Sequence, residues 1–478
     1  MTDDSERGGR WAEVFGPRYA ASMAILALGV ALLAFNSFLT STAMPTAVQE
    51  LGGVALIAWT LTLFLVFAIM GGAGAALFKQ LVGARMALLV SAAVFLVGSL
   101  IAGLAGSMEV VLLGRALQGL GEGLVAAICF ALIPVLFPAR LVPKVFGMQA
   151  MVWAVASFGG PLVAGLLTEF VSWRASFLVS VPLAMIFAGM VLVVVPASAD
   201  AAPTHADFPG LRLLLVGGAI MLVALASLTG PLMAAGLLSV AAAMLVGMVM
   251  LDKNSRTRLM PPDAFRTGSV VGNGLWVVLL MPVAGATSAV YLVLLLQQMW
   301  AYGPTLAGAV AAVLAMAWSA AAIAVANVSE QATRMRLMKV GPALLVLGLF
   351  GVAGGLLGGQ IVLVLLAQIA IGAGFGLGNS SLYVTLMGAA DDAERDRVAA
   401  LVPTTQSAGN AIGAALAGLA ANLAGYASAS SSAAFGQAIV AVFAVGVGIA
   451  GLGLIAALRM TQLMTRQERH AGPRRQPG

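Results

Sequence analysis

The 478-residue sequence contains few of the side chains that enzymes use for chemistry or cross-linking. It has one cysteine, Cys129, and two histidines, His205 and His470, which excludes a disulfide framework and a cysteine or histidine metal cluster. It also lacks the Gly-x-x-x-x-Gly-Lys-Ser/Thr loop that cradles the phosphates of ATP. We therefore expect no cofactor, no metal and no enzymatic activity.

Charge is equally scarce, because only 9% of the residues are charged while 61% are hydrophobic. The mean hydropathy of +1.04 lies above the range of soluble domains and indicates a polytopic membrane protein. The net charge of +6 does not indicate nucleic-acid binding, because the basic residues are scattered in short loops and at both ends. The expected partners are the lipid bilayer and a small substrate.

Long apolar runs fill most of the chain. A bilayer core of about 30 Å needs roughly 20 apolar residues per helix, and these runs are too long and too continuous for barrel strands. The sequence therefore predicts an all-α protein with fourteen transmembrane helices. The predicted spans are 19–44, 55–77, 86–105, 109–136, 145–168, 175–195, 211–229, 232–251, 270–296, 304–326, 340–357, 361–388, 398–425 and 434–458.

A polar linker at 196–210 separates six predicted helices from eight. The predicted domains are an N-terminal tail, a six-helix bundle, a linker with two inserted helices and a cytoplasmic loop, a second six-helix bundle and a C-terminal tail, at 1–18, 19–198, 199–268, 269–458 and 459–478. With both tails inside, only Arg174 among the 24 basic residues falls in an outside loop and only Arg115 in the membrane. We expect a multi-pass protein of the cell (inner) membrane with both termini cytoplasmic.

One predicted helix carries three polar side chains on a single face. Arg115, Gln118 and Glu122 are spaced i, i+3 and i+7, which stacks them along an α-helix. Glu122 is the only carboxylate that the predicted spans place deep in the bilayer. An ionisable residue at that depth is costly and by default marks a pathway for ions or substrate.

An internal repeat indicates two homologous halves. A shift of 253 residues lays glycines of the fourth predicted helix on glycines of the twelfth, and a glycine-rich stretch of the fifth on one of the thirteenth. The matched positions are Gly119, Gly121 and Gly123 with Gly372, Gly374 and Gly376, Arg115 with Gln368, and 160–165 with 413–418. We infer two parallel six-helix repeats with the seventh and eighth helices inserted between them.

Four motifs carry a resemblance to a known family. They are RALQGLGEG at 115–123, GGPLVAG at 159–165, WRASFLVSVP at 173–182 and LMPPDAFRTGSVVGN at 259–273. With them the chain resembles the major facilitator superfamily, and within it the fourteen-helix drug:proton antiporters. The resemblance implies two bundles that work by alternating access and a monomer that exports lipophilic small molecules in exchange for protons.

The resemblance also implies roles for small residues. Gly159, Gly160, Pro161 and Gly165 match the antiporter motif, where missing side chains and a proline bend let helices approach and hinge. The alternative interpretation is generic small-residue packing. Gly83 and Arg85 match the motif between the second and third helices.

Two departures from the family pattern change the expected chemistry. Gln80 and Leu81 stand where the family has Asp and Arg, so the usual charge lock is weakened or rebuilt with Lys79 and Arg85. In the first helix Asn36 stands where the antiporters have Asp, and an amide takes up no proton at physiological pH. Proton coupling is therefore assigned to Glu122 with Arg115. Burial raises the pKa of a carboxyl and a nearby guanidinium lowers it, and this balance can bring the pKa within reach of physiological pH.

Further polar or aromatic residues within spans are candidates for the wall of a substrate cavity, or else interhelical hydrogen-bonding groups. They are Asn36, Thr40, Gln118, Gln149, Trp153, Tyr291, Gln368, Asn379, Gln406 and Asn410. Trp173 and Arg174 are expected to anchor the outer membrane surface.

Three alternatives remain open at the level of sequence. Glu122 can be structural, in a bridge to Arg115 or to an amide. The protein can be a uniporter or symporter for a metabolite, which the missing aspartate of the first helix allows. It can also be a transport-inactive scaffold or sensor, in which case no substrate-dependent flux is expected.

Overall fold

The computed structural model describes residues 11–138, 141–195, 210–255, 258, 260–325, 328, 330–389, 392–426 and 432–471. Within these ranges every regular element is a helix. Most of the predicted linker at 196–210, together with residues 1–10 and 472–478 of the predicted tails, lies outside the described residues.

The helices of the N-terminal half are α1 (Trp11–Val14), α2 (Ala20–Leu51), the 3₁₀ turn η1 (Val54–Leu56), α3 (Ile57–Val82), α4 (Ala84–Gly103), α5 (Met108–Leu136), α6 (Val142–Phe170), α7 (Trp173–Leu178) and α8 (Ser180–Val194). The remaining helices are α9 (Gly210–Ala226), α10 (Pro231–Asn254), α11 (Val270–Trp300), α12 (Pro304–Ala324), α13 (Gln331–Leu357), α14 (Ile361–Ala389), α15 (Asp392–Leu423) and α16 (Ser432–Ala471).

Twelve helical segments of the described chain are long and apolar enough to cross a membrane. Each of the fourteen predicted spans coincides with a helix or, for the sixth, with the pair α7 and α8. The apolar helix α9 has only 17 residues, and α15 is not among the twelve candidates. A multi-pass helical membrane protein is confirmed, whereas the count of fourteen spans stays a prediction.

Several predicted helix ends are wrong. The first helix was expected to end at residue 44, yet α2 continues through Pro45 to Leu51. A proline inside a helix removes one backbone hydrogen bond, and packed neighbouring helices make that loss tolerable. The last helix was expected to end at residue 458, but α16 continues to Ala471 because its polar continuation is still a good helix former.

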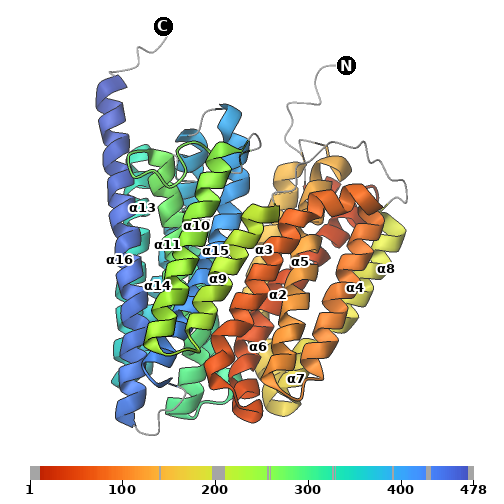
Figure 1. Ribbon diagram of the computed structural model, residues 1–478. Coiled ribbons are helices and arrows are strands. Elements are labelled where there is room, and N and C mark those ends of the chain that lie inside the picture. Colours follow the sequence, from red (N-terminus) through yellow and green to blue (C-terminus); the bar gives the residue numbers. More distant parts are fainter. Residues whose placement is uncertain are drawn as a thin grey trace, which may run out of the picture. The chain divides into compact units, whose positions relative to one another are not determined.

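The chain forms two compact units. Unit 1 comprises Met1–Gly217 with Val293–Ala312, and unit 2 comprises Gly218–Leu292 with Val313–Gly478. The predicted bundle boundaries at 198, 268 and 458 stay a prediction. In unit 1, α5 packs against both α3 and α4, α2 packs against α6, and α8 packs against α2 and α4 (Figure 1).

Glycines let α5 approach its neighbours at backbone distance. A side-chain carbon added at Gly119 would collide with the carbonyl oxygen of Phe64, and one at Gly123 with that of Ala68, both on α3. On another face of α5, a carbon at Gly121 would lie 2.6 Å from the backbone nitrogen of Phe95 on α4. The sequence Gly-x-Gly-x-Gly thus presents alternate glycines to two helices.

The repeat-related glycines of α14 do the same in unit 2. A carbon added at Gly372 would collide with the carbonyl oxygen of Leu314 on α12, and one at Gly374 would lie 2.6 Å from the carbonyl oxygen of Gly341 on α13. The helix pairs α5–α3 and α5–α4 of unit 1 therefore correspond to α14–α12 and α14–α13 of unit 2. This correspondence agrees with the repeat inferred from the sequence.

We predict that Gly123→Ala destabilises the protein, because the new methyl group must push α3 away from α5. Overpacking of this kind typically costs about 1–3 kcal/mol. The loss of stability is measured as a lower melting temperature of the purified protein, with size-exclusion chromatography as the readout of the folded fraction. The matched control is Gly189→Ala in α8, where nothing lies within 4 Å of the added carbon. Equal melting temperatures for the two variants would contradict the close approach.

Candidate functional site

Arg115 is enclosed in unit 1 with 1% of its surface exposed. Its Nη1 donates to Gln118 Oε1 at 2.7 Å, and its Nε donates to the carbonyl oxygen of Thr60 at 3.2 Å. The guanidinium carbon lies 4.1 Å from the centre of the Phe64 ring, a favourable cation–π arrangement. The guanidinium is therefore bound by neutral groups of α3 and α5.

Gln118 is the centre of the buried network. Its Oε1 accepts from Arg115, and its Nε2 donates to Ser99 Oγ at 2.9 Å and to Asn36 Oδ1 at 3.3 Å. The Ser99 hydroxyl in turn donates a hydrogen bond to the carbonyl oxygen of Phe95 at 2.9 Å. One glutamine thus joins α2, α4 and α5, while Arg115 adds α3.

Glu122 lies one turn beyond Gln118 and is 2% exposed. Neither carboxyl oxygen has a hydrogen-bond partner among the described groups. Asn36 on α2 is the neighbouring amide, and its Nδ2 is likewise without a partner. The buried carboxyl therefore has an open bonding capacity beside an amide with an open donor.

The structure bears on the structural alternative for Glu122. In the described hydrogen bonds and ion pairs, Arg115 bonds Gln118 and Thr60 and makes no bridge to Glu122. An amide bridge from Gln118 is also not formed, because both hydrogens of its Nε2 are committed to Ser99 and Asn36. The described hydrogen bonds of Arg115 and Gln118 therefore form neither bridge, while the Asn36 amide lies next to the carboxyl, and the role of Glu122 stays a prediction.

The other cavity candidates of unit 1 are Thr40 on α2 and Gln149 and Trp153 on α6. Thr40 is buried and donates to Asn36 Oδ1 at 3.5 Å. Gln149 on α6 is 5% exposed, and its Nε2 has no described partner. Trp153 follows one turn later, is 41% exposed and meets the Phe38 ring edge-on at 6.4 Å.

The candidates of unit 2 do not gather around a charged group in the described structure. Tyr291 is buried against the ring of Tyr426 at 5.6 Å. Gln368, the repeat counterpart of Arg115, accepts from Ser288 on α11 at 3.1 Å. The remaining candidates are a buried residue of α14 and two half-buried residues of α15, namely Asn379, Gln406 and Asn410.

The glycines of α6 lie at close helix contacts within unit 1. A carbon added at Gly160 would lie 2.6 Å from Cβ of Phe38 on α2, and one at Gly165 would lie 2.5 Å from Cα of Thr305 on α12. Gly159 is less confined, with Phe35 at 3.8 Å. Pro161 is inside α6, and its carbonyl oxygen would lie 2.9 Å from a carbon added at Gly308.

The turn between α3 and α4 is built on Gly83, whose φ of 80° favours glycine. Arg85 then donates from Nη2 to the carbonyl oxygen of Leu192 near the end of α8 at 2.6 Å. This contact caps an open helix end with a cation. It links α4 to α8 through a neutral backbone acceptor.

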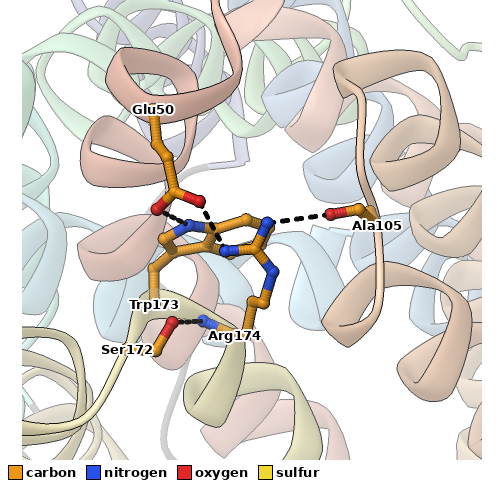
Figure 2. Close-up of polar contacts among 5 residues, drawn as sticks. All are labelled: Glu50, Ala105, Ser172, Trp173 and Arg174. Atoms are coloured by element: carbon orange, nitrogen blue, oxygen red, sulfur yellow. Dashed lines mark hydrogen bonds and ion pairs between the residues drawn. The ribbon is translucent and has the colours of Figure 1, made fainter.

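Trp173 and Arg174 form a polar clasp with Glu50 at the end of α2 (Figure 2). Glu50 Oε2 accepts from Trp173 Nε1 at 2.8 Å, and Glu50 Oε1 accepts from Arg174 Nη1 at 2.6 Å. Arg174 Nη2 reaches the carbonyl oxygen of Ala105 at 3.1 Å. The expected lipid-interface anchor is wrong for Trp173, which is 1% exposed, because its ring packs inside unit 1.

Ser99, Thr60 and Phe64 belong to the network but were not among the sequence candidates. Ser99 and Thr60 are polar residues inside predicted spans, and that signal was available. Phe64 carried no signal, because an aromatic residue in an apolar helix is ordinary and only its position over Arg115 gives it a role.

The comparison with known families decides the identity of this fold. The model of the Major Facilitator Superfamily matches residues 26–414. The chain belongs to the Major Facilitator Superfamily. A Mycobacterium tuberculosis protein described as a "probable multidrug-efflux transporter" is 32% identical over 445 residues, which cover 89% of this chain and 92% of the relative. The chain is therefore a membrane transporter with a relative of the multidrug-efflux type.

Other known proteins are similar over a shorter stretch of the chain or at lower sequence identity. The tetracenomycin C resistance and export protein of Streptomyces glaucescens is 31% identical over 251 residues, 51% of this chain and 46% of that protein. Among solved structures, a peptide transporter in complex with sulfate aligns with a TM-score of 0.68 at 15% identity, covering 94% of this chain and 95% of the other. A D-xylose-proton symporter aligns with a TM-score of 0.65 at 16% identity, covering 93% and 97%. These two likenesses show the fold of the superfamily.

We predict that Gln118→Leu lowers the stability of the transporter by about 1–3 kcal/mol, because Arg115, Asn36 and Ser99 each lose a buried hydrogen-bond partner. Thermal unfolding in detergent measures the change. Gln360→Leu, at an exposed glutamine before α14, is the control and should unfold near the parent temperature. A Gln118→Leu protein as stable as the control would show that the network is not needed for folding.

Proposed function

We propose that this transporter exports lipophilic small molecules in exchange for protons by alternating access, with Glu122 as the proton-coupling group. One observation carries the proposal: a buried carboxyl with two unpaired oxygens beside a polar network in which Arg115, Gln118 and Ser99 bond one another or backbone oxygens. The expected location is the cell (inner) membrane, with both termini cytoplasmic.

The energetic argument starts from the cost of an unpaired charge. An ionised carboxylate in an apolar setting costs several kcal/mol unless it finds a counter-charge or a proton. Arg115 is near enough for its charge to act on Glu122, yet its hydrogen bonds go to neutral groups. The carboxyl is therefore best stabilised by a proton or by a cationic group of a substrate, which makes the two competitors for one site.

Asn36 fits this role as a neutral neighbour. Its Oδ1 is held by Gln118 and Thr40, which leaves the Nδ2 to donate to a deprotonated carboxylate or to a substrate oxygen. Because the amide does not titrate, it does not compete for the proton. The proton is therefore bound on α5, and the additional polar contact is made from α2.

Alternating access needs helices that pack closely and can separate. The glycines of α6 supply the close packing, because Gly160 meets α2 and Gly165 meets the N-terminal end of α12 without side chains between the backbones. Pro161 between them breaks the backbone ladder of α6. We assign to this segment the hinge that opens and closes the pathway.

The substrate class is inferred from the chemistry of the site and the named relatives. The relative from M. tuberculosis is described as a "probable multidrug-efflux transporter", and the one from S. glaucescens as a resistance and export protein. In unit 1 the exposed indole of Trp153 lies on the helix that also carries the unpaired amide of Gln149. A flat or apolar molecule with one cationic or hydrogen-bonding group suits such a surface.

We predict that Glu122→Gln uncouples export from the proton gradient. In proteoliposomes loaded with a lipophilic dye, an imposed pH gradient should speed efflux by the parent protein, and the variant should show the same slow rate with and without the gradient. Glu109→Gln is the matched control, since it removes an exposed carboxyl from the first turn of the same helix. That control should keep the response to pH.

The alternatives give different outcomes in the same assay. Flux that ignores the gradient in the parent protein would indicate a uniporter. A gradient response that survives Glu122→Gln would move the coupling group elsewhere. Absence of flux for all dyes and metabolites tested would favour a scaffold or sensor.

A further inference from the structure

The ends of α13 and α16 enclose a groove that has no part in the proposed transport mechanism. The two helices pack side by side within unit 2 (Figure 1), and the groove between their polar ends has a volume of about 450 Å³. The residues that matter for its chemistry are Arg336, Lys339, Thr461, Gln462, Thr465 and Arg466.

The described lining of the groove is positively charged. Arg336, Lys339 and Arg466 supply three cations, and none of the described residues that line the groove is acidic. None of the three takes part in an ion pair formed by the described side chains. Three convergent cations without a carboxylate favour an anionic ligand.

The hydroxyl groups of the groove are already committed. Thr461 donates to the carbonyl oxygen of Leu458 at 2.9 Å, and Thr465 donates to that of Thr461 at 3.0 Å. Recognition therefore depends on the three charges and on the Gln462 amide, which favours a phosphate group of any headgroup over a specific polyol.

The depth of the groove matches the phosphate layer of a bilayer. Residues 340–357 of α13 and 435–458 of α16 contain no charged side chain, and the basic residues follow directly at 336–339 and 459–466. Basic pockets between transmembrane helices at this level are suited to anionic lipid headgroups. The same ends lie on the side that the lysine and arginine pattern predicts to be cytoplasmic.

Apolar side chains continue from the groove along both helices. Val340 and Leu347 of α13 are 41% and 64% exposed, and Leu458 and Ile455 of α16 are 40% and 47% exposed. Acyl chains beneath a headgroup in the groove would cover such side chains. A free phosphate ion would leave them uncovered.

We propose that this groove binds the phosphate headgroup of an anionic phospholipid, whose acyl chains lie along α13 and α16. The bound lipid adds a charged link between the ends of α13 and α16. The proposal is independent of the identity of the exported molecule and of the role of Glu122.

Thermal unfolding of the full-length protein in detergent tests the proposal. Added phosphatidylglycerol should raise the melting temperature of the parent protein by at least about 2 °C relative to phosphatidylcholine. The triple variant R336Q/K339Q/R466Q should lose most of that increment. The control variant R18Q/K79Q/R266Q removes the same charge from scattered positions and should keep it.

Three results would overturn the proposal. An equal loss in both triple variants would show a general attraction of charge. Inorganic phosphate that raises the melting temperature as much as the lipid would show a site for a free anion. Native mass spectrometry of the single variants, used if the triple variant fails to fold, would contradict the site if Arg336→Gln and Lys339→Gln retain phosphatidylglycerol as the parent does.

Discussion

The buried guanidinium of Arg115 is the constraint on which the arrangement of the first unit depends. A charge enclosed among apolar helices must be compensated by groups that are held in place. The carbonyl oxygen of Thr60, the amide of Gln118 and the ring of Phe64 provide that compensation from two helices. Because Gln118 then bonds Ser99 and Asn36, the positions of α2, α3, α4 and α5 are coupled through one network.

The network needs helices at backbone distance, and glycine makes that distance possible. Gly119 and Gly123 bring α5 onto α3, where Thr60 and Phe64 meet Arg115. The second unit repeats the packing at Gly372 and Gly376 but places Gln368, not an arginine, at the corresponding point. The two halves therefore share a scaffold, and the described structure has the charged network in the first half.

The sequence predicted the helical class and the polar face of α5 that carries Arg115, Gln118 and Glu122, because hydropathy and helical spacing are local properties. It did not predict that α2 continues past Pro45 or that Trp173 is buried against Glu50, since both depend on neighbours distant in the chain. Asn36 was recognised as a departure from the family pattern, but its position beside Glu122 required the packing of α2 on α5. Phe64 could not be distinguished from other apolar residues without its geometry.

The central claim is that a proton and a substrate compete for Glu122. The most direct measurement is proton release on drug binding, read with a pH indicator in weakly buffered solution of the purified protein. The account predicts that the parent protein releases protons in proportion to occupancy by a cationic lipophilic drug and that Glu122→Gln binds without release. Equal proton release from both proteins would contradict the assignment of the coupling site to Glu122.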